Sequence, residues 1–339
     1  MDALLTILKR KKNRLVILIA SGLITLTFLG IISLCIGPAY IGFQETVQAI
    51  LDSNYKSNIR NIVVNIRFPR LLNAIIIGAA LSVAGMVMQA LLRNPLVDPY
   101  ILGVSSGAAL GAAAMFLIGP SLLYIPIAAF LGGLLAFGAT ITLSKLAGGS
   151  PLSVVLAGIA VGTGLSSVLT LLIYFSEEKG HHIILWIIGS LSMSKWQEVN
   201  ILSPIVTIAV IYVSLRVREL NAALLGEEHA MQLGVNVNRL KYEMFIIVAL
   251  ITSISVSFSG VIGFIGLVSP HICRMIVGGD HRLLLPASII VGANMLLAAD
   301  LAARTIKMPI ELPLGAIISI IGVPFFIYLL IKTRGRYAI

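Results

Sequence analysis

The sequence predicts an all-α polytopic membrane protein with about ten transmembrane helices, and three observations lead to this prediction. Hydrophobic residues make up 58% of the chain and charged residues 11%, whereas a soluble protein carries roughly a quarter charged residues. The mean hydropathy is +1.03. The apolar residues also form runs of about 20, the length that an α-helix needs to cross a bilayer. We therefore expect a single transmembrane domain over residues 1–339.

The first apolar run, residues 15–36, follows a basic segment and in this respect resembles a signal peptide. The run is about 22 residues long and lacks a small-residue cleavage site, so we interpret it as a retained first helix. Nine further apolar runs follow it. We expect spans at residues 15–36, 71–91, 102–118, 122–143, 152–175, 201–215, 242–259, 261–277, 283–301 and 314–331.

Basic residues at the ends of these runs predict the orientation. Lys9 to Arg14 precede the first span, and Lys332, Arg334 and Arg336 follow the last. An even number of spans brings both termini to one side, and the positive-inside rule makes that side the cytoplasm. This topology of a cell-membrane protein accounts for the net charge of +10 better than a nucleic-acid partner does, because the basic residues do not cluster on a soluble surface.

One long polar stretch, residues 216–241, interrupts the apolar sequence. Two short helices fit inside it: one opens at Asn221 as an N-cap and stops at Gly226, and the other ends at Gly234. Flanking basic residues place the stretch on the cytoplasmic side. Helices shorter than about 12 residues are marginal in water, so this pair is expected to pack either on a soluble partner or on its own membrane domain.

Three arginines are expected on the opposite side, where the positive-inside rule disfavours them. Arg67 and Arg70 stand before the second span, and Arg304 follows the ninth. Asp300 lies four residues before Arg304, a spacing that allows an ion pair on one helix face. The three arginines are either interface anchors or a basic surface that binds an acidic partner through guanidinium–carboxylate contacts.

Small residues recur at four-residue spacing within some spans, as at Gly158 and Gly162. This spacing lets helix backbones approach closely in lipid, so helix packing is one interpretation. Polar side chains such as Ser166 and Thr170 lie in the same span, and a polar passage is therefore the other interpretation.

Two blocks with a proline near the end of an apolar run, 94–95 and 270–271, are also open to two interpretations. The first is that each block ends or caps a helix. The second is that it transmits the movement of a partner.

The sequence contains no motif for catalysis or cofactor binding. The phosphate-binding pattern G-x-x-x-x-G-K-[ST] is missing, so the chain is not expected to hydrolyse ATP alone. No His or Cys residues have metal-ligand spacing, and Cys35 and Cys273 are expected near opposite membrane faces, which disfavours a disulfide. Of the carboxylates that proton-coupled transport would need, Asp300 and Glu311 qualify, and both fall near outer ends of spans. We expect no enzyme activity, no metal and no cofactor.

Several long motifs occur in a consistent order along the chain. They are RFPRLLNAIIIGAALSVAGMVMQALLRNPLVDPYILGVSSGAALGA (67–113), GEEHAMQLGV (226–235), GVIGFIGLVSPHICRMIVGGDHRLLLPAS (260–288), ADLAAR (299–304) and ELPLGAIISIIGVPFFIYLL (311–330). In these motifs the chain resembles the FecCD-type permease family of iron-chelate and cobalamin ABC importers. The resemblance covers nearly the whole chain and is weakest over its first 60 residues and over about 115–150 and 175–215.

The resemblance implies a BtuC-like, type II importer fold in which two permease subunits, identical or related, enclose the translocation path. It also implies two cytoplasmic ABC ATPase subunits and an extracytoplasmic substrate-binding protein as partners. The family's ATPase-coupling loop matches Gly226, Glu227, Glu228, Ala230, Leu233 and Gly234. The family's external arginines, which bind the binding protein, match Arg67, Arg70 and Arg304. The family's fifth and tenth helices line the path, which by position implicates Gly158, Gly162, Ser166, Thr170 and Gly315.

The leading hypothesis is a permease that imports an iron chelate, a ferric siderophore before cobalamin or haem, while partner subunits hydrolyse ATP. An ion-coupled secondary transporter is the alternative from another class, but no span clearly provides a carboxylate near the membrane midplane. A membrane scaffold with a cytoplasmic interaction loop would explain residues 216–241 and leave the external arginines without a role. Neighbouring genes for an ATPase and a binding protein would separate the three hypotheses.

Overall fold

The computed structural model describes residues 2–119, 122–176 and 179–332, and every regular element in these ranges is a helix. The α-helices are α1 (Asp2–Cys35), α2 (Phe43–Leu51), α3 (Ser57–Arg60), α4 (Phe68–Leu91), α5 (Val104–Ile118), α6 (Ile125–Leu146), α7 (Pro151–Phe175), α8 (Lys179–Ile187), α9 (Trp196–Leu215), α10 (Val217–Leu224), α11 (Glu227–Gln232), α12 (Val237–Ser259), α13 (Ile265–Val277), α14 (His281–Thr305) and α15 (Leu314–Lys332). A π-helical segment η1 (Asn61–Arg67) and two short 3-10 helices, η2 (Pro99–Leu102) and η3 (Leu122–Tyr124), complete the described elements.

Each of the ten expected spans overlaps one of these α-helices. They are α1, α4, α5, α6, α7, α9, α12, α13, α14 and α15. Among the described residues, 7 helices are long and apolar enough to cross a membrane, and α5, α13 and much of α15 form shorter apolar helices. The prediction of an all-helical membrane fold with about ten spans is confirmed.

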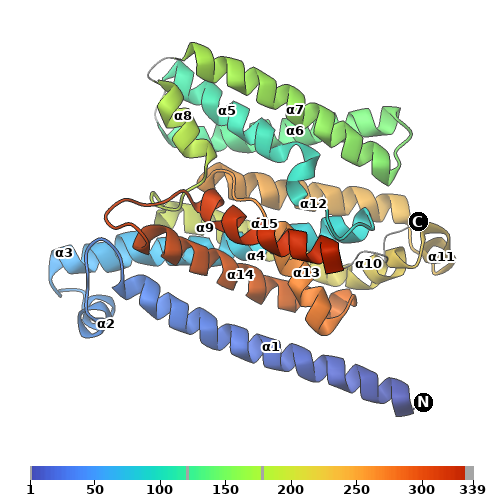
Figure 1. Cartoon of the computed structure of the whole chain (residues 1–339), viewed down its shortest axis with the longest axis horizontal. Coiled ribbons are helices and arrows are strands. Elements are labelled where there is room, and N and C mark those ends of the chain that lie inside the picture. Colours follow the sequence, from blue (N-terminus) through green and yellow to red (C-terminus); the bar gives the residue numbers. More distant parts are fainter. Residues whose placement is uncertain (1, 120–121, 177–178, 333–339) are drawn as a thin grey trace.

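The central helix is α4, which is buried along most of its length and packs against α9, α12, α13 and α14 (Figure 1). Two glycines allow its backbone to touch its neighbours. A Cβ added at Gly78 would collide with the carbonyl oxygen of Gly292 in α14, and one at Gly85 would collide with that of Gly266 in α13. Such direct backbone contact is typical of helices that pack in lipid. Helices α5 to α8 form a layer on one side of this centre, and α1 runs along the other side.

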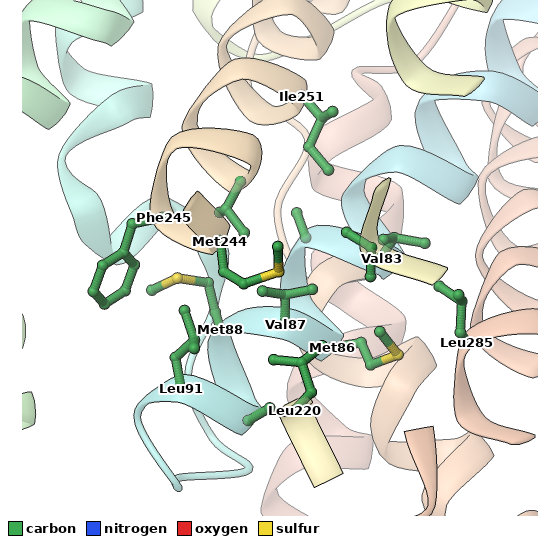
Figure 2. Packing of buried hydrophobic residues seen from close by; sticks show 14 of the residues in the cluster. Val83, Met86, Val87, Met88, Leu91, Leu220, Met244, Phe245, Ile251 and Leu285 are labelled. Atoms are coloured by element: carbon green, nitrogen blue, oxygen red, sulfur yellow. The ribbon is translucent and has the colours of Figure 1, made fainter. Parts of the chain in front are cut away.

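The largest apolar cluster lies where α4, α10, α12 and α14 meet, and Figure 2 shows part of it. It contains Val83, Met86, Val87, Met88 and Leu91 from α4, Leu220 from α10, Met244, Phe245 and Ile251 from α12, and Leu285 from α14. Leu220 is fully buried there. The short helix α10 is thus packed into the main apolar core.

The two ends of the bundle are formed by different elements. Helices α10 and α11 lie at the same end as the start of α1, whereas α2, α3 and the segment between α14 and α15 lie at the opposite end (Figure 1). We call the first the hairpin end and the second the arginine end, because Arg67, Arg70 and Arg304 lie there. The start of α1 and the polar stretch 216–241 therefore share one end, as the expected topology requires.

Pro270 does not end a helix, contrary to the simpler expectation, but lies inside α13. Proline has no N–H to donate to the carbonyl oxygen four residues earlier. The Gln89 side chain of α4 supplies the missing donor: its Nε2 lies 3.4 Å from the oxygen of Gly266 and 3.2 Å from that of Leu267. A partner from a neighbouring helix therefore lets the proline remain within the helix.

Candidate coupling hairpin and buried arginine cluster

Two short helices, α10 and α11, form a hairpin at one end of the bundle, and we call residues 217–234 the coupling hairpin. Gly226 has a φ of 119° and Gly234 a φ of 81°, values in a region that residues with a Cβ disfavour. Gly226 separates the two helices, and Gly234 follows the end of α11. Both glycines lie at the boundaries that the sequence predicts.

The first helix of the hairpin begins earlier than expected, and Asn221 does not cap it. Arg216 ends α9 and precedes α10, which starts at Val217. Glu219 stands in the first turn of α10 and accepts a hydrogen bond of 2.6 Å from Nη1 of Arg216. An acidic side chain in this turn favours the helix because it faces the positive end of the helix dipole. Hydrogen bonds to Tyr212 and Glu219 raise the pKa of Arg216, which therefore stays charged.

Asn221 instead joins the hairpin to α14. Its Nδ2 donates to Oδ1 of Asp280 at 2.6 Å, and its Oδ1 accepts from the backbone N–H of His281 at 2.8 Å. Nδ1 of His281 lies 2.7 Å from the same Oδ1. Asn221 is recognisable from the sequence as a polar residue at a helix boundary, but its partners 59 and 60 residues away are not.

The predicted coupling residues differ in exposure. Glu228 and Gly234 are exposed, and Leu233 is 66% exposed. Gly226 and Glu227 are half-buried, and Glu227 accepts a 2.7 Å contact from Nζ of Lys241. The exposed members lie in α11 and just after it, where another protein can reach them.

Ala230 is the exception among the predicted coupling residues, because it is fully buried. It packs with Ala222 of α10 and Val237 of α12 in a small apolar cluster. Ala230 therefore holds α11 against the bundle and offers no surface to a partner.

A groove of ≈ 550 Å³ lies beside the hairpin and is lined from α10, α12 and the turn between α11 and α12. Arg218, Glu219 and Arg239 supply charged groups to it, and Leu233 supplies an exposed apolar one. Nearby Leu225 is 67% exposed. Exposed apolar side chains surrounded by charges are typical of a surface that binds another protein.

At the opposite end, Arg70 is the centre of a buried ion cluster. Its guanidinium lies 2.8 Å from Asp300 of α14 and 2.7 Å from Glu311, which precedes α15. Arg304 lies 3.6 Å from Asp300, which confirms the expected pairing at four-residue spacing. Asp300 is completely buried, and its charge is balanced by two basic neighbours, Arg70 and Arg304.

The other two arginines also use internal partners. Arg67 donates from Nη1 to the carbonyl oxygen of Leu34 at 2.6 Å and from Nη2 to that of Ala39. Arg304 donates from Nη2 to the carbonyl oxygen of Ser33 at 2.8 Å and also to its hydroxyl. These contacts tie α1 and the segment after it to the start of α4 and the end of α14.

The burial of these arginines changes the docking hypothesis. Arg67, Arg70 and Arg304 are 4%, 5% and 3% exposed, whereas the sequence predicts guanidinium groups that reach outward to an acidic partner. A docking role now requires the internal contacts to open when the partner binds. It stays a prediction, and internal cross-linking is the role that the geometry supports.

A further polar pair lies in the same half of the bundle. Nδ2 of Asn73 in α4 donates to Glu198 in the first turn of α9 at 2.8 Å. The span expected here starts at residue 201, so Glu198 lies outside it. The early Trp196, which begins α9, is the signal that would have moved the boundary.

The residues assigned to the translocation path are placed differently from one another. Ser166 and Thr170 are exposed on α7, and Gly162 is half-buried. Gly158 is buried, and a Cβ there would collide with the carbonyl oxygen of Ile101. Gly315 in α15 lies close to the carbonyl oxygen of Ile188. Two of the five are thus exposed, one of them with its hydroxyl 3.1 Å from that of Ser106 in α5, and Gly158 and Gly315 serve close backbone packing.

No metal-binding constellation is present within residues 2–119, 122–176 and 179–332: no three His, Cys, Asp or Glu side chains are grouped to hold an ion. Cys35 and Cys273 are both free, and Cys273 is buried.

Comparison with known proteins gives consistent matches. The model of the FecCD transport family matches residues 25–332. The hemin transport system permease protein HmuU of Yersinia pestis is 38% identical over 314 residues, 90% of this chain and 94% of that protein. The cobalamin import system permease protein BtuC of Halobacterium salinarum is 39% identical over 296 residues, 86% of this chain and 76% of that protein.

Among solved structures, one described as an inward-facing conformation of a metal-chelate type ABC transporter matches with a TM-score of 0.83 and 30% identity. The match covers 93% of this chain and 98% of that one.

Proposed function

The chain belongs to the FecCD transport family, and we propose that it is the permease subunit of an ATP-driven importer that carries a metal chelate across the cytoplasmic membrane. The coupling hairpin is the observation that supports this function most strongly. It combines exposed Leu225 and Leu233 with charged neighbours and a groove of ≈ 550 Å³. A subunit of an ATP-driven transporter that has no nucleotide-binding motif of its own needs such a surface, because a separate ATPase must bind there and move it.

The partners in this proposal are two ABC ATPase subunits at the hairpin end, a substrate-binding protein at the arginine end and a second permease subunit. The cytoplasm lies at the hairpin end, together with the start of α1. The exposed faces of α7 and α15 support pairing with a second permease. Only 22% of the most apolar 18-residue stretch of α7 is buried. In α15, Ile320 and Ile321 are 70% and 63% exposed.

The substrate in this proposal is a bulky metal chelate, and an iron chelate such as a ferric siderophore or hemin ranks first. Relatives named for hemin and cobalamin support a cargo of this size and chemistry. The small and hydroxyl side chains at Gly162, Ser166 and Thr170 support a wide path with weak contacts, which a large cargo can leave again.

The mechanism follows from the placement of the hairpin. ATP binding draws the partner subunits together and displaces α10 and α11, and the permease changes between inward-open and outward-open states. Nucleotide supplies this energy only because the ATPase binds it with different affinity in the two states. The chain itself forms no covalent intermediate.

The proposal is tested first at the end of the hairpin by Leu233→Arg. A long cation on an apolar contact residue is expected to weaken binding of the candidate ATPase to the permease in nanodiscs by about tenfold or more. The matched control is Leu146→Arg, because Leu146 is 82% exposed and lies at the end of α6, outside the hairpin. Equal ATPase affinity of the Leu233→Arg variant and the wild type would rule out the hairpin as the coupling site.

The substrate is tested separately by uptake into proteoliposomes that contain the permease and the ATPase, with the binding protein outside. Ferrichrome labelled with ⁵⁵Fe, hemin and cyanocobalamin are compared at equal concentration. Faster uptake of the two iron compounds is expected, and transport of cyanocobalamin alone would contradict the assignment to iron chelates.

A further inference from the structure

Asn221 is the polar link between the coupling hairpin and α14, and its geometry determines how each group bonds. Oδ1 faces the backbone N–H of His281 at 2.8 Å, and Nδ2 faces the carboxylate of Asp280 at 2.6 Å. The reverse orientation of the amide would set donor against donor and acceptor against acceptor. Nδ1 of His281, 2.7 Å from Oδ1, therefore carries the proton and donates.

This link is partly shielded from water. His281 is fully buried, and Asn221 and Asp280 are half-buried. Asp280 is also the N-cap of α14, because its side chain accepts from the N–H of Arg282 at 3.0 Å. Hydrogen bonds to a charged carboxylate in a shielded site are among the stronger ones in proteins. One amide of α10 thus holds the first turn of α14 in place.

The hairpin has other attachments, polar ones to α12 and apolar ones in a cluster that includes α14. Arg216 binds Glu243 at 2.8 Å and so links the start of α10 to α12. Leu220 anchors α10 in the apolar core, where many neighbours share the contact. Asn221 provides the directed polar contact to α14 among the described residues of the hairpin.

The helix that Asn221 holds reaches across the bundle. α14 has 25 residues, which at 1.5 Å per residue corresponds to about 37 Å. Near its far end, Asp300 pairs with Arg70, and Arg70 pairs in turn with Glu311 just before α15. α14 continues through an internal proline, Pro286, without interruption. It therefore connects its first turn to the ion cluster and, through that cluster, to the start of α15.

We propose that Asn221 is the positioning residue that locks the coupling hairpin to α14, so that α14 carries the displacement of the hairpin through the membrane domain. The proposal rests on the proposed function, because the displacement comes from a partner ATPase. A purely structural role would alter stability, whereas this role sets how much substrate moves for each ATP hydrolysed.

The test exchanges the amide and the carboxylate. Asn221→Asp removes the donor and places two carboxylates about where the 2.6 Å contact now lies. Asp280→Asn keeps the link, because the new amide oxygen still accepts from Nδ2 of Asn221. The double variant Asn221→Asp/Asp280→Asn again pairs a donor with an acceptor, since the new amide donates to the new carboxylate. The amide oxygen of Asp280→Asn then takes over the bond from the N–H of Arg282, which the same Oδ1 of Asp280 accepts in the wild type.

Uptake and ATP hydrolysis are measured together in proteoliposomes with the ATPase and the binding protein, using whichever of ⁵⁵Fe-ferrichrome, hemin and cyanocobalamin the wild type transports. We expect Asn221→Asp to hydrolyse ATP but to move about tenfold less substrate per ATP, the effect of losing one charge-assisted hydrogen bond. Asp280→Asn and the double variant are expected within about twofold of the wild type.

An unchanged ratio of uptake to ATP in Asn221→Asp would overturn the proposal, and so would a lowered ratio that the double variant fails to restore. If Asn221→Asp melts well below the wild type, Asn221→Ser is measured in its place, and a wild-type ratio there overturns the proposal equally. Failure of the proposed function is distinguishable, because the wild type itself would then show no uptake driven by ATP.

Discussion

At the scale of single residues, the arginine end shows how a buried charge can connect distant segments. Arg70 brings together Asp300 and Glu311, which lie 230 and 241 positions later in the sequence. A guanidinium with two carboxylates is suited to this role because its planar fork can bind both through paired N–H groups. The cluster therefore fixes α4, α14 and the start of α15 relative to one another.

Replacement of Arg70 by Ala is expected to destabilise the protein by about 3–5 kcal/mol, because it leaves the buried carboxylate of Asp300 without its main partner. Thermal unfolding of the purified protein in detergent measures this, with Lys307→Ala at an exposed position of the same end as the control. A variant that melts like the wild type but binds the substrate-binding protein more weakly would restore the docking hypothesis in its original form.

Only some of these side-chain contacts could be predicted from the sequence. The pair of Asp300 and Arg304 follows from four-residue spacing on one helix. The contacts of Arg70 and Asn221 do not follow from spacing, because they depend on which helices meet in three dimensions. Exposure is similarly hidden: Arg67 stands beside a span in the sequence but is bound to carbonyl oxygens of a different helix and loop.

At the scale of elements, close helix contacts depend on glycine. The backbones of α4 and α13 touch at Gly85 and Gly266. A backbone oxygen cannot rotate away as a flexible side chain can, so an added methyl group must push the helices apart. Gly138 of α6 provides the contrast, because no atom lies within 4 Å of a Cβ added there.

Gly85→Ala is expected to cost about 2–3 kcal/mol of stability through overpacking. Gly138→Ala is expected to be neutral or to stabilise by roughly 0.5–1 kcal/mol, since alanine favours a helix interior over glycine. Unfolding midpoints of the two variants, measured side by side, check the prediction. Equal midpoints would show that α4 and α13 do not pack as closely as described.

The elements themselves could largely be predicted from the length and hydropathy of the apolar runs, because a bilayer demands about 20 apolar residues from each spanning helix. The residues at which the helices begin and end were harder to predict. α10 starts before Asn221 because Arg216 and Glu219 support an earlier first turn. α13 continues through Pro270 because Gln89 of another helix satisfies the freed carbonyl groups.

At the scale of the whole molecule, the two ends are joined by α14. One end carries the exposed coupling hairpin, and the other carries the buried ion cluster. That the hairpin lies at the same end as the start of α1 was predictable from the basic residues around 216–241, but the physical connection between the ends was not. Sequence alone gives the order of the spans, whereas their contacts determine how a local push is transmitted.

The measurement that tests the account most directly is uptake of ⁵⁵Fe-ferrichrome or hemin into proteoliposomes under two driving forces. ATP is supplied to the ATPase in one set, and a proton or sodium gradient without ATP is supplied in the other, with Glu228→Ala as the hairpin variant. The account predicts uptake that requires ATP and falls in Glu228→Ala. Uptake that follows the ion gradient and ignores ATP would contradict it.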